Sequence, residues 1–294
     1  MSPVLVALAS ALFAGVVATA VTLAIEKWGG VVGGFLGTLP TTIVPAAVGV
    51  QMTLPSSEAF TDAMFITPAA MFINAGFLFF WREVPSRLPR WGLSTRLAVM
   101  TVLSLTAWLV GAVVLVATTT WIRGMGWSMS AFGLGTTALL ATIGILACLR
   151  PLPAPKGHRR VGPGTLVARG LLAAGAIAAT VWIAHTGGAL AAGVASVFPA
   201  IFLTTMVSLW LSQGEAVPAG AAGPMMLGST SVATYALVAS QSLPTLGPVF
   251  GSIVAWLAAA GFVTLPATMW LSRRRRRQAL RSEQLAELDG ASAP

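Results

Sequence analysis

Hydrophobic residues along this chain gather into nine long runs that are separated by short polar or charged segments. Each run is about 20 residues long, which is the length that an α-helix needs to cross the hydrocarbon core of a bilayer. Their approximate bounds are 3–25, 31–51, 60–81, 95–119, 131–150, 164–184, 188–211, 217–240 and 247–271. The pattern predicts an all-α polytopic membrane protein with about nine transmembrane helices.

Two of these runs contain glycines and prolines where a membrane helix would otherwise be regular. They read GGFLGTLPTTIVP over residues 33–45 and GVASVFPAIFLTT over residues 193–205. A proline inside a helix removes one backbone hydrogen bond and clashes with the preceding turn, so both helices are predicted to kink or break. Broken backbone is tolerated at membrane depth only where protein or a water-lined cavity satisfies the freed carbonyls. Broken helices in matching positions of two halves are typical of the central site of a transporter.

The order of features in the first half of the chain returns in the second half. Pro40 and Pro199 are 159 residues apart. Each half has an apolar helix, the broken helix, a link with a glutamate, a third helix with an internal proline (Pro68 or Pro224), and a fourth helix. The additional run at 131–150 inverts the second half relative to the first. The sequence therefore predicts a four-plus-one-plus-four inverted repeat, an architecture suited to alternating access.

The predicted organisation divides the chain into four parts. They are a first repeat (1–130), a linking helix with a basic cytoplasmic loop (131–162), a second, inverted repeat (163–272) and a basic and polar tail (273–294).

Composition and charge agree with a membrane location. Of 294 residues, 56% are hydrophobic and only 9% are charged, whereas soluble domains carry about 25% charged residues. The N-terminal run lacks a positive leading segment and exceeds the usual apolar core of a signal peptide, so it is predicted to be a retained first helix. The single cysteine, Cys148, excludes an intramolecular disulfide.

The net charge of +9 is better explained by orientation in the membrane than by nucleic-acid binding. Cytoplasmic loops are enriched in lysine and arginine. With nine crossings and the C-terminus inside, all of the 17 lysines and arginines except Arg123 fall on the cytoplasmic side. We therefore expect a multi-pass protein of the inner (plasma) membrane, with the N-terminus outside and the C-terminus in the cytoplasm. The arginine run 273–277 is interpreted as a stop-transfer signal, with anionic lipid as the alternative ligand.

Three acidic residues are candidates for coupling transport to protons. Glu58 and Asp62 are four residues apart and share one helix face. Asp62 lies about one turn into the third run, where an ionised carboxylate costs roughly 2.5–3.5 kcal/mol. The alternative is that acids at a helix start interact favourably with the helix dipole. Glu215 occupies the corresponding link of the second half.

Neutral polar residues beside the predicted breaks are candidates for binding a small solute. Hydroxyl groups and freed backbone groups together can coordinate a ligand, and Asn74 adds an amide within the third run. The alternative is that these small residues pack helices together. The candidates are Thr38, Pro40, Thr41, Thr42, Asn74, Ser196, Pro199, Thr204 and Thr205.

Catalytic patterns are missing from the sequence. The histidines are His158, in a basic loop, and His185, at a helix end, and no HExxH, CxxC or Walker-type glycine loop occurs. Asp62 is the only aspartate in the predicted helices, which excludes an intramembrane pair of catalytic aspartates. We therefore expect no enzyme, no cofactor and no dedicated metal site.

The run AGVASVFP at residues 192–199 resembles the signature of GlpM-like small bacterial membrane proteins, which are four-helix proteins with an AG-x-x-x-x-FP stretch in the second helix. The run GGFLGTLP at residues 33–40 is similar, with glycine for alanine and leucine for phenylalanine. The resemblance covers about 40 residues in each half. It implies a fused, inverted duplication of a unit that otherwise would pair as an antiparallel dimer, and it implies no substrate.

These patterns favour a secondary transporter of a small solute, with a site near the midplane between the two broken helices and proton coupling through the carboxylates. A divalent-metal carrier using Glu58 and Asp62 is the alternative within transport. A non-transporting scaffold or lipid-handling component of envelope biosynthesis is the alternative from another class. The expected partners are the lipid bilayer and a small molecule or ion, and the sequence leaves the oligomeric state open.

The distribution of positive charge gives a direct test of topology. Reporter fusions should place the C-terminus in the cytoplasm and the segment after Arg123 outside, because positive charge is retained on the cytoplasmic side. A cytoplasmic signal from a reporter inserted at 124–128 would contradict the count of nine crossings and, with it, the inversion.

Overall fold

The computed structural model describes residues 3–28, 39–150, 152, 162–186, 188–274, 276–277 and 280, and these residues form helices and connecting turns with no strand. The elements are α1 (Pro3–Trp28), α3 (Ile43–Thr53), α4 (Ser57–Glu83), the 3₁₀ turn η1 (Pro85–Arg87), α5 (Leu93–Gly124), α6 (Met129–Leu149), α7 (Pro163–His185), α8 (Ala189–Ala195), α9 (Ala200–Gln213), α10 (Ala216–Ala259) and the π-helical turn η2 (Ala260–Thr264). The predicted all-α class is confirmed.

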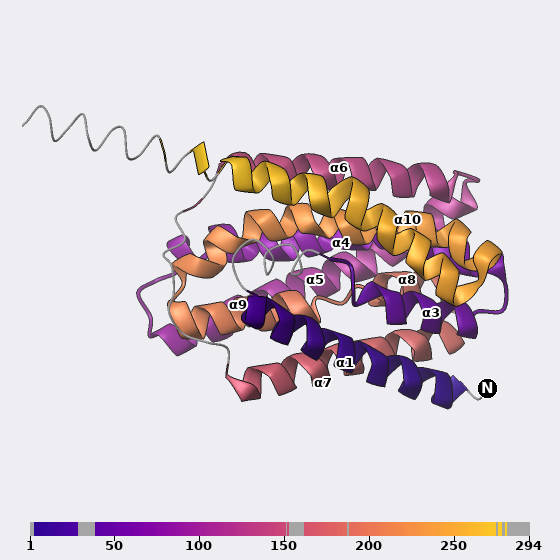
Figure 1. The fold of residues 1–294 in the computed structure, drawn as a ribbon, viewed down its shortest axis with the longest axis horizontal. Helices are drawn as coiled ribbons and strands as arrows, with labels where there is room; N and C mark the ends of the chain where they lie inside the picture. The colour runs from indigo at the N-terminus through magenta and orange to yellow at the C-terminus, as the bar shows by residue number, and fades with distance from the viewer. Residues whose placement is uncertain are drawn as a thin grey trace, which may run out of the picture.

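Five helical segments of the described chain are long and apolar enough to cross a membrane. They are Ser57–Glu83, Leu93–Gly124, Met129–Leu149, Ala189–Leu211 and Ala216–Arg274. The segments in α5 and α6 keep most of their apolar side chains exposed, including Val113 on α5 and Leu146 on α6. Large exposed apolar faces of this kind need a lipid or protein environment. Helix α4, in contrast, is mostly buried and lies at the centre of the molecule (Figure 1).

Helix α10 is a hairpin of two antiparallel helical segments that meet at Gly247. The chain reverses at Gly247, whose φ of 78° and ψ of 171° are accessible to glycine and costly for other residues. Across the reversal, the Tyr235 hydroxyl donates to Ser252 Oγ at 3.3 Å and Ser242 Oγ donates to the Gly251 carbonyl at 2.9 Å. The two segments correspond to the last two apolar runs of the sequence.

The helices sort into two bundles (Figure 1). Bundle A consists of α1, α3, α7, α8 and α9, with α1 packed along α7. Bundle B consists of α4, α5, α6 and α10, with α4 packed along α10 and α6 resting on both. The N-terminus and the end of the helical segment that continues from α10 to Arg274 lie at opposite ends of the molecule. The main contact between the bundles is that of α4 with α8, together with α10 against α3 and α9.

Glycines allow the helices to approach closely at two crossings. In bundle A, a Cβ atom at Gly15 of α1 would lie 3.2 Å from the Gly170 carbonyl oxygen of α7. Between the bundles, a Cβ atom at Gly193 of α8 would lie 2.2 Å from the Ala63 carbonyl oxygen and 2.4 Å from Ile66 Cγ2 of α4. Small residues have this role at helix crossings in membranes.

Gly193→Ala should destabilise the protein by about 1–3 kcal/mol or more, because the new methyl group meets backbone that cannot move aside easily. The measurement is the thermal melting midpoint in detergent. Gly135→Ala in α6 is the matched control, since a Cβ atom there meets nothing within 4 Å. Equal melting midpoints for the two variants would show that α4 and α8 are not in close contact.

Candidate functional site

The predicted break in the second half is present between α8 and α9. Helix α8 ends at Ala195, helix α9 begins at Ala200, and Pro199, which has no backbone N–H, directly precedes α9. In the first half, Pro40 is buried and non-helical, and α3 begins only at Ile43. The predicted site residue Thr38 and the glycines that precede it lie outside the described residues.

Asn74 is the polar group that joins the break to bundle B. Its side chain is buried in α4, and its Nδ2 donates to the Val197 carbonyl within the break at 2.7 Å. Its Oδ1 accepts from Trp108 Nε1 of α5, also at 2.7 Å. The Trp108 ring packs edge-on against Phe198, with ring centroids 5.1 Å apart. The sequence singled out Asn74 but not Trp108, because a tryptophan in an apolar run carries no pattern that distinguishes it.

A second freed carbonyl of the break is also satisfied by protein. The Gly193 carbonyl accepts from Ser196 Oγ at 2.7 Å and from Thr67 Oγ1 of α4 at 3.4 Å. Thr67 also donates to the Ala63 carbonyl of its own helix at 3.0 Å. In this conformation, side chains of the protein therefore donate hydrogen bonds to the freed carbonyls of the break.

The other candidate hydroxyls differ in their partners. Thr204 Oγ1 donates to the Ala200 carbonyl of its own helix at 2.9 Å. Thr205 Oγ1 is buried and finds no hydrogen-bond partner in the described part of the chain. Thr41 and Thr42 form the half-buried turn before α3. Trp210 Nε1 and Thr230 Oγ1 are also buried without a hydrogen-bond partner among the described residues, as are Gln51 Oε1 and Arg96 Nε.

Two of the three acidic candidates form ion pairs, at opposite ends of α5. Asp62 is buried and pairs with Arg123 at one end of α5, which we call the Arg123 end. Glu215 Oε2 lies 2.8 Å from Arg96 Nη1 at the other end, the Arg96 end. Glu58 is exposed. In the sequence, Arg96 and Arg123 indicate only topology, and their spacing along α5 does not predict the pairing.

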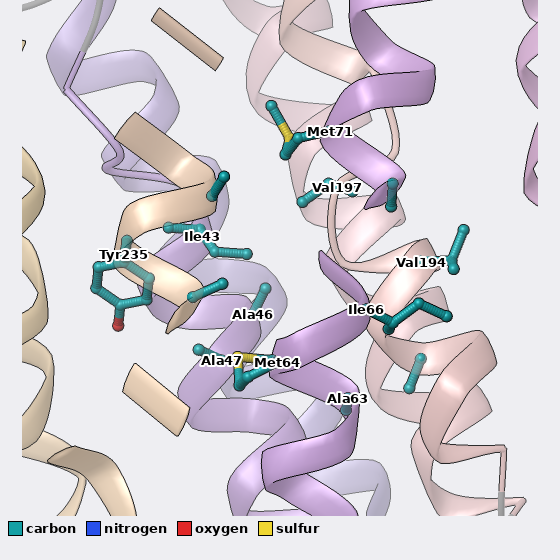
Figure 2. Close-up of a cluster of buried hydrophobic side chains, with 14 of the residues drawn as sticks. Ile43, Ala46, Ala47, Ala63, Met64, Ile66, Met71, Val194, Val197 and Tyr235 are labelled. Atoms are coloured by element: carbon teal, nitrogen blue, oxygen red, sulfur yellow. The ribbon is translucent and has the colours of Figure 1, made fainter. Parts of the chain in front are cut away.

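The space between the bundles near the breaks is filled by apolar side chains (Figure 2). Bundle B contributes Ala63, Met64, Ile66 and Met71 from α4 and Tyr235 from α10, and bundle A contributes Ile43, Ala46 and Ala47 from α3 with Val194 and Val197 from α8 and the break. All of these side chains are nearly inaccessible to solvent. We call this set the interbundle cluster. No group of three or more histidine, cysteine, aspartate or glutamate side chains occurs among the described residues.

No family model, curated protein or solved structure matches the chain. The function is therefore inferred from the molecule itself.

Asn74→Ala should destabilise the fold strongly, because it leaves the Val197 carbonyl and the Trp108 N–H without partners, at about 1–3 kcal/mol for each buried group. Trp108→Phe should also destabilise, and the double variant should cost less than the sum of the single variants, since the residues share one hydrogen bond. Melting midpoints of the four proteins in detergent measure the coupling.

Trp121→Phe is the control for this cycle, since Trp121 is on the same helix but 66% exposed. Additive effects of Asn74→Ala and Trp108→Phe would show that the two side chains do not interact.

Proposed function

We propose that this protein is a secondary transporter of a small solute that works by alternating access in the inner membrane. In this proposal the chain crosses the membrane nine times, as two inverted repeats of four helices joined by α6. The observation that carries it is the antiparallel packing of corresponding helices of the two halves, with a discontinuous helix between them. In inverted-repeat transporters, the solute usually binds beside discontinuous helices at the interface of the two repeats.

Helix boundaries support the duplication. The starts of α4 and α10, Ser57 and Ala216, are 159 residues apart, which is the spacing of Pro40 and Pro199. A fused duplication of GlpM-like units, which the sequence resembles, would account for this equal spacing.

The directions of the helices support the inversion. Near the start of α4, Thr61 Oγ1 donates to the Ser240 carbonyl of α10 at 3.0 Å. At the other end of α4, Arg82 Nη1 lies beside Gly223 of α10. Helix α4 is thus antiparallel to the first segment of α10, and α1 is likewise antiparallel to α7 (Figure 1).

The ion pairs give a physical basis for proton coupling. Helix α5 has 32 residues, so its ends are about 48 Å apart. Asp62 and Glu215 therefore place one titratable carboxylate near each end of the molecule. Protonation of either carboxylate would remove its attraction to Arg123 or Arg96. We propose Asp62 as the principal coupling residue because it is the more buried of the two, with 12% of its side chain exposed against 36% for Glu215.

One observation favours the alternative of a non-transporting scaffold or lipid-handling protein. The interbundle cluster is closely packed, and the carbonyls of Gly193 and Val197 are satisfied by the protein itself. A scaffold would keep this arrangement permanently, whereas a transporter must open it. A transport measurement separates the two functions.

Purified protein in proteoliposomes should accumulate at least one solute from a panel of metal ions, amino acids, sugars, organic anions and neutral organic molecules when a pH gradient is imposed. A thermal-shift screen of the same panel selects the solutes to test. Asp62→Asn should abolish accumulation driven by the gradient while leaving counterflow exchange partly intact, because exchange requires binding but no net proton movement.

Glu83→Gln is the control, because Glu83 is a carboxylate of α4 that pairs with Arg82 and Arg87 at the Arg96 end, away from the ion pair of Asp62 with Arg123. Normal accumulation by Asp62→Asn across a series of pH values would reject Asp62 as the coupling residue. Absence of uptake for every solute that shifts the melting midpoint would favour the scaffold.

A further inference from the structure

We infer that the solute binds between the two bundles, at the interbundle cluster, and that it is a small uncharged molecule with a largely apolar surface. This inference rests on the proposed transport function and adds the class of substrate to it.

Among the residues whose side chains the structure describes, no charged one belongs to the interbundle cluster, although Asp62 directly precedes Ala63 on α4. The ion pair of Asp62 with Arg123 joins α4 to α5, and that of Glu215 with Arg96 joins the start of α10 to α5, so both lie inside bundle B and near its ends. The remaining arginines and glutamates whose side chains the structure describes are at positions 58, 82–90, 150, 273, 274, 276 and 277. A solute at the cluster would therefore lie against apolar side chains, and its charged neighbour on α4, Asp62, is paired with Arg123.

Bundle B is also braced at the Arg96 end. Arg82 Nη1 donates to the Ala147 carbonyl at the end of α6 at 2.9 Å. Arg274, beyond α10, donates to the carbonyls of Cys148 and Leu149, each at 3.1 Å. These bonds tie α4 and α10 to the C-terminus of α6. Charged hydrogen bonds are the stronger ones in proteins, so bundle B is expected to move as one body.

The contacts that cross between the bundles are weaker and of another kind. Asn74 and Thr67 donate to the carbonyls of Val197 and Gly193, at 2.7 and 3.4 Å. The other crossing contacts of the cluster are apolar, and the Trp81 and Trp210 rings meet edge-on at 5.9 Å. Apolar surfaces can separate and close again around an apolar guest without leaving a charge unpaired. The boundary between the bundles is therefore where we place the opening.

Small side chains mark the place within this boundary where a guest can fit. Ala46 and Ala47 of α3 face Met64 of α4, with Ala63 one residue away (Figure 2). A small shift of α3 from α4 would expose methyl groups and a flexible thioether, which adapts readily to different shapes. The polar groups within reach are neutral amides and hydroxyls, such as Asn74.

The chemistry of this lining discriminates against charge. Burying an ionised group without a counter-charge costs several kcal/mol even after relaxation. An uncharged molecule of the same size pays no such cost and gains from the apolar contact. A charged analogue should therefore bind about tenfold or more weakly than its neutral counterpart, since 1.4 kcal/mol corresponds to a factor of ten.

The test uses a cysteine reporter in the cluster and three probes of similar size. Ala46→Cys in a Cys148→Ala background is reconstituted in proteoliposomes, and its rate of alkylation by N-ethylmaleimide is measured. Benzyl alcohol, benzoate and benzylammonium are then added at equal concentrations. We expect benzyl alcohol to slow alkylation of the cysteine at position 46 and the two ions to require about tenfold higher concentrations or more for the same effect.

Two further variants make the result specific. Val113→Cys, on the exposed face of α5, reports any general effect of the probes on the bilayer or the reagent and should be unaffected. Ala47→Cys is a second reporter in the cluster, and it carries the test if Ala46→Cys does not fold.

Protection by either ion equal to that by benzyl alcohol would overturn the inference about charge. Alkylation at position 46 that no probe slows would overturn the location of the site. Either result would leave the transporter proposal standing if proteoliposome uptake is positive. Resistance of both reporters to alkylation, together with absent uptake, would instead reject the transporter.

Discussion

The structure depends on one constraint, which is that a helix broken in an apolar interior must have its freed carbonyls satisfied by something other than water. Pro199 prevents the regular continuation of α8 into α9. The Val197 carbonyl is then held by Asn74, and Asn74 is held in turn by Trp108. This chain of two hydrogen bonds reaches from bundle A through α4 to α5. These two hydrogen bonds place α4 between the break and α5, and α4 also packs along α10, so it lies at the centre of the molecule.

The same constraint explains why polar side chains of bundle B serve its own assembly. The end of α6 leaves carbonyls without helical partners, and Arg82 and Arg274 donate to them. Ser231 Oγ pairs with Thr264 Oγ1 at 2.8 Å, which links the two segments of α10 beside the π-helical turn. With its polar groups used internally, bundle B presents mainly apolar side chains to bundle A. Polar bonds inside bundle B and mainly apolar contacts between the bundles, with Asn74 and Thr67 as the polar exceptions, are therefore two results of the same distribution of polar residues.

Much of the fold could be predicted from the sequence, and less of the site. The apolar runs predicted the helices, and Pro199 predicted the break, because both signals are local. The reversal of α10 falls at Gly247, which is the first residue of the last predicted run. The partners of Asp62 and Glu215 could not be predicted, since Arg123 and Arg96 approach them only after α5 packs beside α4 and α10. Trp108 was missed because its role comes from the position of Asn74 in space.

The two halves of the proposed repeat differ at the position of Asn74, which holds the break of the second half. At the repeat spacing, the residue that corresponds to Asn74 is Ala233, which is buried and has no polar side chain. The side chain of Ala233 cannot donate a hydrogen bond. It therefore cannot form, with a carbonyl of the first predicted break, the bond that Asn74 forms with the Val197 carbonyl of the second. In an inverted repeat, exchange of the two halves exchanges the two open states. In the proposed transport cycle, the state that separates Asn74 from Val197 would therefore lose a buried hydrogen bond that Ala233 cannot form in the other open state, so the two open states would differ in free energy.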